Sequence, residues 1–258
     1  IAAAGKDDGW AIGQESTDFV LLHRQDGSWQ RARMPLPSDK GLMNIALDAS
    51  APDNVWLFAG AETPVARRWD GQRWRSIPID FTVLDTVVLA PDDVWALDSS
   101  LDDDRFVARH WDGKRWSAHF LPYPTIALGA SGPDDLWAVG WREDATGRTS
   151  MQPAVMRFDD KVWRSVPVPS DRYAQRKPHE QSKLTEVVAV SPDNAWAFGD
   201  HSYRPDDPDA EFHHESTAWR WDGKRWRKVP NVPHARVSIH PYPEMAATGD
   251  GAGGFVLG

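Results

Sequence analysis

The 258 residues suffice for one large all-β domain or two smaller domains, and the fifteen tryptophans can build a substantial core. The formal net charge of −9 argues against a general nucleic-acid-binding protein, because phosphate contacts require a basic surface. The absence of cysteine excludes disulfides, thiolate metal sites and a cysteine nucleophile, and the absence of a run of about eighteen apolar residues predicts no membrane span.

One pattern recurs along the chain. Each copy has a short apolar strand, an aspartate-rich turn, a second strand with Trp or Phe, and then Trp-Asp-Gly-x-x-Trp or a variant of it. The second-strand aromatics follow one another at roughly 40 to 60 residues, a period typical of propeller blades, and helical periodicity is missing. The aromatics are Trp10, Trp56, Trp95, Trp137, Trp196 and Phe255, in copies at about 1–37, 43–80, 85–123, 125–169 and 184–233 and a partial copy at 244–258.

Each complete copy divides into four predicted strands. Small apolar residues in strand one suit an innermost strand, and the Arg-rich strand four suits an outer edge, where charge deters aggregation. Asp-Gly between strands three and four supplies the positive φ of a tight hairpin, and Pro-Asp between strands one and two suits a type I turn. Strand one is expected at 43–49, 85–90, 125–130 and 185–190, strand three at 64–69, 106–111, 153–158 and 217–221, and strand four at 73–78, 115–121, 162–168 and 225–230.

The repeat predicts an all-β fold, a β-propeller of four-stranded antiparallel blades in a single domain over 1–258. We expect six blades, with seven as the alternative. The partial copy at 244–258 supplies only strands one and two, so strands three and four of that blade would precede Ile1 or follow Gly258. The chain begins without Met or a signal peptide, so the compartment stays open, and a secreted or cell-envelope protein whose leader was processed or left out is one reading.

These copies resemble the Trp-rich β-propeller repeat proteins of bacteria, loosely within the kelch and galactose-oxidase-like superfamily. The resemblance is carried by PDNVWLFAG at 52–60, by RRWDGQRW at 67–74 and by their copies, and it implies a soluble repeat scaffold. The complete copies lack the Gly-Gly pair of kelch proteins, and the Gly-His motif of WD repeats is missing. Copper chemistry of the galactose oxidase kind is not expected, since its Tyr–Cys crosslink needs a cysteine.

Most repeat residues are expected to be scaffold. The strand-two tryptophans occupy equivalent places in every copy, which favours packing between blades. The tryptophans that flank the Asp-Gly turns have two readings, packing or exposed rings on which a sugar stacks. The cation before the strand-three aromatic is expected to lay its stem over the outer Trp. These cations are Arg24, Arg68, His110, Arg157 and Arg220.

Departures from the repeat gather in copies four and five. Insertions at 141–152, 169–183, 200–216 and 231–243 are expected as neighbouring loops on one face, where a rigid scaffold usually carries function. Arg suits the binding of a carboxylate, and His or Tyr suits proton transfer. The candidates for acid–base chemistry are therefore His201, Tyr203, His240, Tyr242, Arg172 and Arg204.

A divalent metal is a second hypothesis for these insertions. His213, His214 and Asp200 offer imidazole and carboxylate groups suited to Zn²⁺, Mn²⁺ or Fe²⁺. Adjacent residues of a strand point to opposite faces, so solvated histidines are the favoured reading and no cofactor is expected. The acidic stretches 102–104 and 206–209 lack the glycine-punctuated spacing of a calcium loop and are expected to be solvated.

No phosphate loop, nucleophile elbow or zinc-protease motif is present. We therefore expect a binding module whose loop face in copies four and five meets a small-molecule, glycan, peptide or protein ligand. The alternatives are a propeller lyase or hydrolase that uses the His, Tyr and Arg of these loops, and a structural repeat domain of a larger protein. Loops that converge on one void would favour the enzyme, and loops that splay over a flat surface would favour the binding module.

Overall fold

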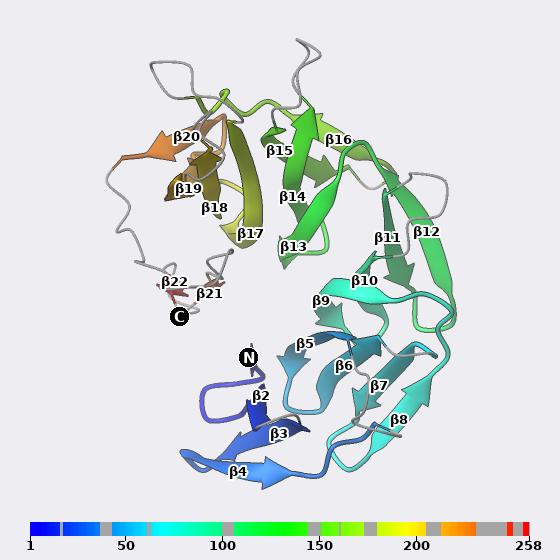
Figure 1. Ribbon diagram of the computed structural model, residues 1–258. Helices are drawn as coiled ribbons and strands as arrows, with labels where there is room; N and C mark the ends of the chain where they lie inside the picture. The colour runs from blue at the N-terminus through cyan, green and yellow to red at the C-terminus, as the bar shows by residue number, and fades with distance from the viewer. Residues whose placement is uncertain are drawn as a thin grey trace. The chain divides into compact units, whose positions relative to one another are not determined.

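The computed structural model describes residues 1–15, 18–36, 43–60, 63–99, 106–143, 151–159, 161–172, 180–204, 213–230, 247–249 and 255–257. Every regular element within these ranges is a β-strand (Figure 1). No helix in the described part of the chain is long and apolar enough to cross a membrane. The chain divides into two compact units, Ile1–His119 and Phe120–Gly258, with the boundary inside one strand.

The first unit is built from three four-stranded antiparallel sheets, each a meander in chain order. The alternation of apolar and polar residues along each strand buries one set of side chains between neighbouring sheets. The strands are β1 (Ala2–Ala3), β2 (Gly9–Glu15), β3 (Asp18–Gln25) and β4 (Ser28–Ala32); β5 (Met43–Ala51), β6 (Asn54–Gly60), β7 (Val65–Trp69) and β8 (Trp74–Ile77); and β9 (Val83–Ala90), β10 (Asp93–Asp98), β11 (Phe106–Trp111) and β12 (Trp116–Leu121).

The second unit repeats this design in two further four-stranded sheets and adds a two-stranded one. The predicted four-stranded antiparallel organisation is therefore confirmed for all five complete copies, and the described part of the sixth copy pairs two strands. The strands are β13 (Thr125–Gly132), β14 (Asp135–Glu143), β15 (Met151–Phe158) and β16 (Trp163–Val166); β17 (Gln181–Ser191), β18 (Asn194–Tyr203), β19 (His213–Trp221) and β20 (Trp226–Val229); and β21 (Ala247–Gly249) with β22 (Phe255–Leu257).

Within each unit, a tryptophan of strand two lies between two tryptophans of the following sheet. The Trp137 ring is 5.2 Å from Trp221 and 5.4 Å from Trp226, centroid to centroid, and the second pair is edge-to-face. Tilted and edge-to-face pairs suit the quadrupoles of aromatic rings. The tryptophans that flank the Asp-Gly turns therefore pack between sheets. The same clamp joins Trp10 to Trp69 and Trp74 at 5.6 and 5.3 Å, and Trp56 to Trp111 and Trp116 at 6.1 and 6.2 Å.

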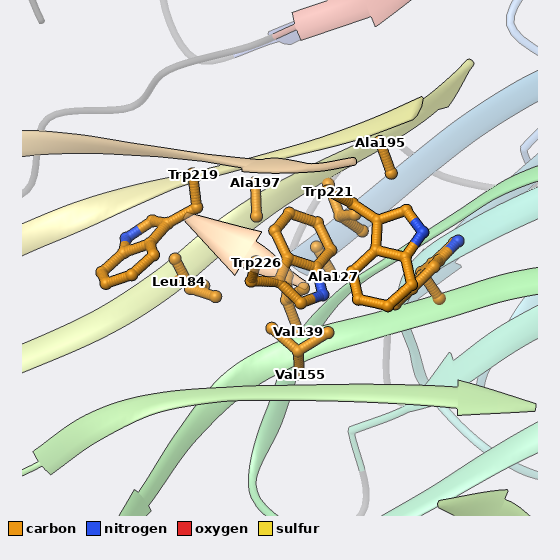
Figure 2. Packing of buried hydrophobic residues seen from close by; sticks show 11 residues of the cluster. Ala127, Val139, Val155, Leu184, Ala195, Ala197, Trp219, Trp221 and Trp226 are labelled. Atoms are coloured by element: carbon orange, nitrogen blue, oxygen red, sulfur yellow. The ribbon is translucent and has the colours of Figure 1, made fainter. Parts of the chain in front are cut away.

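Small and branched residues fill the space around the clamp of the second unit. Figure 2 shows Trp219, Trp221 and Trp226 of the sheet β17–β20 over Val139 and Val155 of the sheet β13–β16. The three tryptophans are buried, so each contributes about 150–250 Å² of apolar area to this core. The core thus fixes which face of β17–β20 looks toward β13–β16.

The indole N–H groups of Trp56 and Trp137 are bound by their own sheets. Trp137 donates its Nε1–H to Asp135 Oδ1 at 2.9 Å. Arg157 donates to the same oxygen at 2.7 Å, and its guanidinium lies 4.9 Å from the centre of the Trp137 ring. In the sheet β5–β8, Arg68 donates a hydrogen bond to Oδ1 of Asn54. In the sheet β9–β12, the His110 ring stacks on the Trp95 ring with centroids 4.5 Å apart. The cations therefore stack on the Trp of strand two, and the prediction that they cover the outer Trp was wrong.

In the first sheet the prediction named the wrong cation. Arg24 pairs with Gly9, and His23 lies opposite Trp10 with ring centroids 3.8 Å apart. The cause is the shape of the turn. Asp26 and Gly27 form a two-residue hairpin, both with positive φ, whereas the later copies have four-residue loops, so alignment on Asp-Gly shifts copy one by one residue.

The later Asp-Gly loops are thus wider than the tight hairpin that we predicted. In the loop between β7 and β8, Trp69 pairs with Trp74, and Gly71 alone has a positive φ. Asp70 accepts hydrogen bonds from the backbone N–H groups of Arg73 and Gln72 at 2.9 and 3.1 Å. The bond from Arg73 is the main reason that the pKa of Asp70 falls to about 2.

The glycines of these loops differ in their surroundings, which gives a matched test. Gly27 and Gly113 both have positive φ, at 79° and 87°. A Cβ on Gly113 would lie 2.8 Å from Cβ of Asp92, whereas a Cβ on Gly27 would meet nothing within 4 Å. We expect Gly27→Ala to cost about 1 kcal/mol of unfolding free energy through φ alone, and Gly113→Ala to cost about 1–3 kcal/mol more through the clash. Urea unfolding followed by tryptophan fluorescence measures both, and equal losses would contradict the contact.

Asp48 links the first strands of two neighbouring sheets. Its Oδ2 accepts a hydrogen bond from the backbone N–H of Val88 at 2.7 Å. Burial, which disfavours the charged form, raises the pKa of Asp48 from 3.8 to about 7. The folded protein therefore keeps a proton that the unfolded chain loses, and this group lowers stability as the pH rises from about 4 to about 7.

Replacing this carboxyl should flatten that pH dependence. We expect Asp48→Asn to raise the unfolding free energy by about 1–2 kcal/mol at pH 8 and by less at pH 5. The gain at pH 8 is smaller than the full pKa shift would give at about 1.36 kcal/mol per pKa unit. Thermal unfolding at the two pH values measures the difference. Asp134→Asn makes the same charge change at an exposed turn and should show no such difference. An equal gain from Asp48→Asn at both pH values would show that the carboxyl is ionised throughout.

Candidate functional site

The strands of the sheet β17–β20 run further than the sequence suggested. β17 has 11 residues and β18 has 10, against 8 and 6 in the equivalent β9 and β10. Asp200, His201 and Tyr203, expected in a loop, lie in β18, and the expected loop residues His213 and His214 lie in β19. The loop assignment was wrong for residues 200–203 and 213–216, because these two stretches contain no Gly or Pro and the ladder of hydrogen bonds continues through their polar residues.

The extension separates the candidate residues onto two faces. Residues paired across an antiparallel ladder point to the same face, and neighbours along a strand alternate. His201 pairs with Ser182 and Glu215, and Tyr203 pairs with His213. This set shares its face with Ala197 and Trp219, so it continues the face that packs against β13–β16. Asp200, Ser202 and His214 point to the opposite face.

His201 is buried between two carboxylates. It is 1% exposed. Its Nε2 lies 2.9 Å from Oε1 of Glu180, and its Nδ1 lies 3.5 Å from Oδ1 of Asp171. The two carboxyl side chains are 5% and 3% exposed. Asp171 precedes and Glu180 follows the stretch 173–179, so the imidazole contacts the chain on both sides of that connection.

Asp171 is the centre of this buried cluster. Its Oδ2 accepts a hydrogen bond from the Ser182 hydroxyl at 2.9 Å, and its Oδ1 accepts one from Lys228 Nζ at 2.5 Å. Its backbone N–H donates to Oε1 of Gln152 at 3.1 Å. Gln152 is 1% exposed and lies in β15. The carboxylate thus takes donors from β17 and β20, while its own amide is held by the neighbouring sheet.

The cluster is continuous with the hydrophobic core. Lys228 Nζ lies 6.0 Å from the centre of the Trp219 ring, and Trp219 belongs to the core shown in Figure 2. Both residues lie opposite each other in the ladder of β19 and β20. The polar cluster therefore closes one end of the apolar contact between β13–β16 and β17–β20.

On the opposite face, Asp200 is paired with a cation. Lys183 Nζ lies 3.7 Å from Asp200 Oδ1, and the two residues are register partners. Burial raises the pKa of Asp200, against the lowering effects of Lys183 and of His214. The position of His214 on this face brings it into the surroundings of Asp200, whereas His213 points away from both.

The exposed end of the hairpin carries an aromatic pair. The rings of Tyr203 and His213 stack with centroids 4.6 Å apart and planes at 13°. Tyr203 is half-buried and His213 is exposed. Arg172 is exposed next to Asp171, and Arg204 is half-buried at the end of β18. The remaining candidates, His240 and Tyr242, lie outside the described residues.

The described residues do not bring the three candidate metal ligands together. His213 points to the face opposite His214 and Asp200. Among the residues that the structure describes, no group of three or more His, Asp or Glu side chains is placed to hold a metal ion. The acidic stretches 102–104 and 206–209 lie outside those residues. The site in the described part is thus a hydrogen-bonded cluster of charged side chains.

Sequence reasoning missed the three residues that organise this cluster. Asp171 and Glu180 lay unmarked inside an insertion, because an acidic residue in a loop is ordinarily solvated. Lys228 carried a signal. It stands in strand four where copies two, three and four have the small residues Ser76, Ala118 and Ser165, although copy one has Arg31 there.

Comparison with known proteins bears on the fold. Neither a family model nor a curated protein matches the sequence. Among solved structures, the chain is similar to a fucose-recognising lectin of Aleuria aurantia with a six-bladed β-propeller fold, at TM-score 0.52 and 11% identity over 95% of this chain and 81% of the lectin. A second structure of that lectin, a mutant in complex with alpha-methyl-L-fucoside, gives TM-score 0.54 and 11% identity over 99% and 91%.

A third solved structure has the same degree of similarity. YCF48 from Cyanidioschyzon merolae matches at TM-score 0.52 and 14% identity over 88% of this chain and 67% of that one. Identities this low carry the fold and no more. The chain has a β-propeller fold. The all-β organisation in four-stranded antiparallel sheets, predicted from the repeat, is the feature that it shares with these structures.

Removal of the Asp171 carboxylate should destabilise the second unit. We expect Asp171→Ala to cost about 1–3 kcal/mol, because it leaves the buried Ser182 hydroxyl without its acceptor and removes the ion-pair partner of Lys228. Arg164→Ala is the matched control, since it removes an ion pair with Asp159 whose side chains are 69% and 40% exposed, and it should cost less than about 1 kcal/mol. Urea unfolding measures both. A loss for Asp171→Ala as small as that of the control would show that the cluster is hydrated.

Proposed function

We propose that this β-propeller binds carbohydrate at the exposed end of the β18–β19 hairpin. The observation that carries the proposal is the stacked pair of Tyr203 and His213, which extends beyond the hydrophobic core. Aromatic faces bind the apolar faces of sugar rings, and nearby polar groups bind the hydroxyls. The Tyr203 hydroxyl and the exposed carboxylate of Glu215, on the same face of the sheet, offer such groups.

The buried cluster supports the proposal by making the hairpin rigid. Binding sites are more selective when the residues that contact the ligand are held in place before it arrives. His201 and Ser182 lie next to the aromatic pair on the same face, and both are bound to Asp171. The aromatic pair therefore stands on a base that the rest of the sheet holds in place.

The solved structures agree with this class of ligand. The lectin of Aleuria aurantia, which shares the fold at 11% identity, was solved with alpha-methyl-L-fucoside. A fucoside is thus a reasonable first ligand to test. A peptide that binds the hairpin in place of a sugar is one outcome of the test below.

The buried state of His201 argues against the enzyme alternative in the form that we predicted. A general acid or base must reach the proton that it moves. His201 is 1% exposed, and its two ring nitrogens face Glu180 and Asp171. In the proposed function His201 therefore positions the hairpin, and Tyr203 contacts the ligand.

Loss of the aromatic pair should weaken glycan binding. We expect the intact chain to bind on a glycan array that includes fucosides and acidic sugars. His213→Ala and Tyr203→Ala each remove stacking of about 1 kcal/mol, which corresponds to about fivefold weaker binding. Trp29→Ala removes an aromatic that is 42% exposed in another sheet and should leave binding unchanged. An array without signal, or binding that survives loss of both aromatics, would overturn the proposal; in that case a peptide library tests the other ligand class.

A further inference from the structure

We propose that the donors around Asp171 form a carboxylate-binding site of the sheet β17–β20, which the chain fills with its own side chain. The donors belong to three strands of that sheet. Ser182 lies in β17, His201 in β18 and Lys228 in β20. The carboxylate comes from elsewhere, from the connection that follows β16. The site and its occupant are thus separate parts of the chain.

The geometry matches a carboxylate with two oxygens. Oδ1 of Asp171 is shared by Lys228 Nζ at 2.5 Å and His201 Nδ1 at 3.5 Å. Oδ2 takes the Ser182 hydroxyl at 2.9 Å. A planar anion with two acceptor atoms satisfies donors on both sides, which a spherical anion such as chloride does not.

Burial makes the site depend on its anion. The side chains of Asp171 and His201 are 3% and 2% exposed, and Ser182 is 0% exposed. Lys228 is 41% exposed and lies at the rim of the site. Without the carboxylate, the buried Ser182 hydroxyl would lose the acceptor that it has in the folded protein. A buried donor without an acceptor is unfavourable, and a cation at the rim attracts an anion, so the site retains an affinity for a carboxylate when Asp171 no longer supplies one.

Glu180 contributes by orienting the imidazole. It lies 2.9 Å from Nε2 of His201, on the ring nitrogen away from Asp171. A hydrogen bond on one ring nitrogen fixes the direction of the other, here toward the Asp171 carboxylate. Glu180 is therefore a positioning residue of the site, and the anion lies between Lys228, His201 and Ser182.

The ligand class that follows is a small carboxylate. Formate has the two oxygens of the Asp171 carboxyl and fits the volume that an Asp→Ala change would vacate. This inference is independent of glycan binding at Tyr203 and His213, because its test needs no sugar. Failure of the glycan array and failure of the anion site are therefore separate results.

Chemical rescue tests the site directly. Asp171→Ala should be destabilised, and formate should restore its stability in a saturable way. A tenfold excess of formate over its dissociation constant shifts the unfolding equilibrium about tenfold toward the folded state. The measurement is urea unfolding of Asp171→Ala with sodium formate, against sodium chloride at equal ionic strength. The unchanged protein, whose site is filled, should respond equally to the two salts.

Two controls isolate the anion and its partner. Formamide has nearly the shape of formate without its charge and should not restore stability. The double variant Asp171→Ala with Lys228→Met should lose the response to formate, because the main cation of the site is gone. Rescue by formamide, or rescue that persists without Lys228, would show a filled cavity and would overturn the anion site.

The anion site can be tested even if Asp171→Ala is too unstable to fold without formate. If Asp171→Ala does not fold in chloride, refolding from urea is measured with and without formate, and recovery of native tryptophan fluorescence only with formate supports the site. If formate changes neither stability nor refolding yield over a range that saturates ordinary carboxylate sites, the inference is wrong. Asp171→Asn, whose amide occupies the same space, should be insensitive to formate in both experiments.

Discussion

The clamp of one tryptophan between two tryptophans of the next sheet is the contact on which the rest of the structure depends. Trp137 can enter the space between Trp221 and Trp226 only if the Asp-Gly loop sets those two rings apart on adjacent strands. Its indole N–H must also be satisfied, and Asp135 accepts it. Because the aspartate is needed for the indole and for Arg157, the repeat carries its acidic turn, its Trp and its cation as one unit.

This unit decides where function can lie. The sequence suggested two groups of residues as possible ligand contacts: the cations of strand three and the tryptophans of the clamps. Both groups pack against other side chains or form hydrogen bonds within a sheet. A ligand site must then use residues that break the repeat. Lys228, which stands where two other copies have serine, is such a break. His201, Tyr203, His213 and Glu215 of the prolonged β18 and β19 are others, and they lie on the same face of the sheet as Lys228.

The sequence predicted the sheets well because period, turn residues and aromatic spacing are local signals. It predicted the site less well for two physical reasons. A shift of one residue reverses which face a side chain occupies, so the tight turn at Asp26 was enough to exchange Arg24 for His23. The partners of a buried charge lie far apart in sequence, as Asp171 and Lys228 do, and composition does not reveal that a loop aspartate is 3% exposed. His201, by contrast, was found from its insertion alone, with a role that burial then changed.

The contrast between two kinds of aspartate shows why the buried cluster deserves a functional reading. Asp70 and its equivalents bind backbone N–H groups and an arginine at exposed turns, where ion pairs add little to stability. Asp171 pairs with Lys228 and His201 where desolvation is costly, and apolar residues of similar volume often stabilise such places as well or better. Stability alone therefore does not explain the cluster. The proposed function supplies a reason: charged groups with fixed donor directions would hold Tyr203 and His213 in one arrangement, which an apolar contact specifies less strictly.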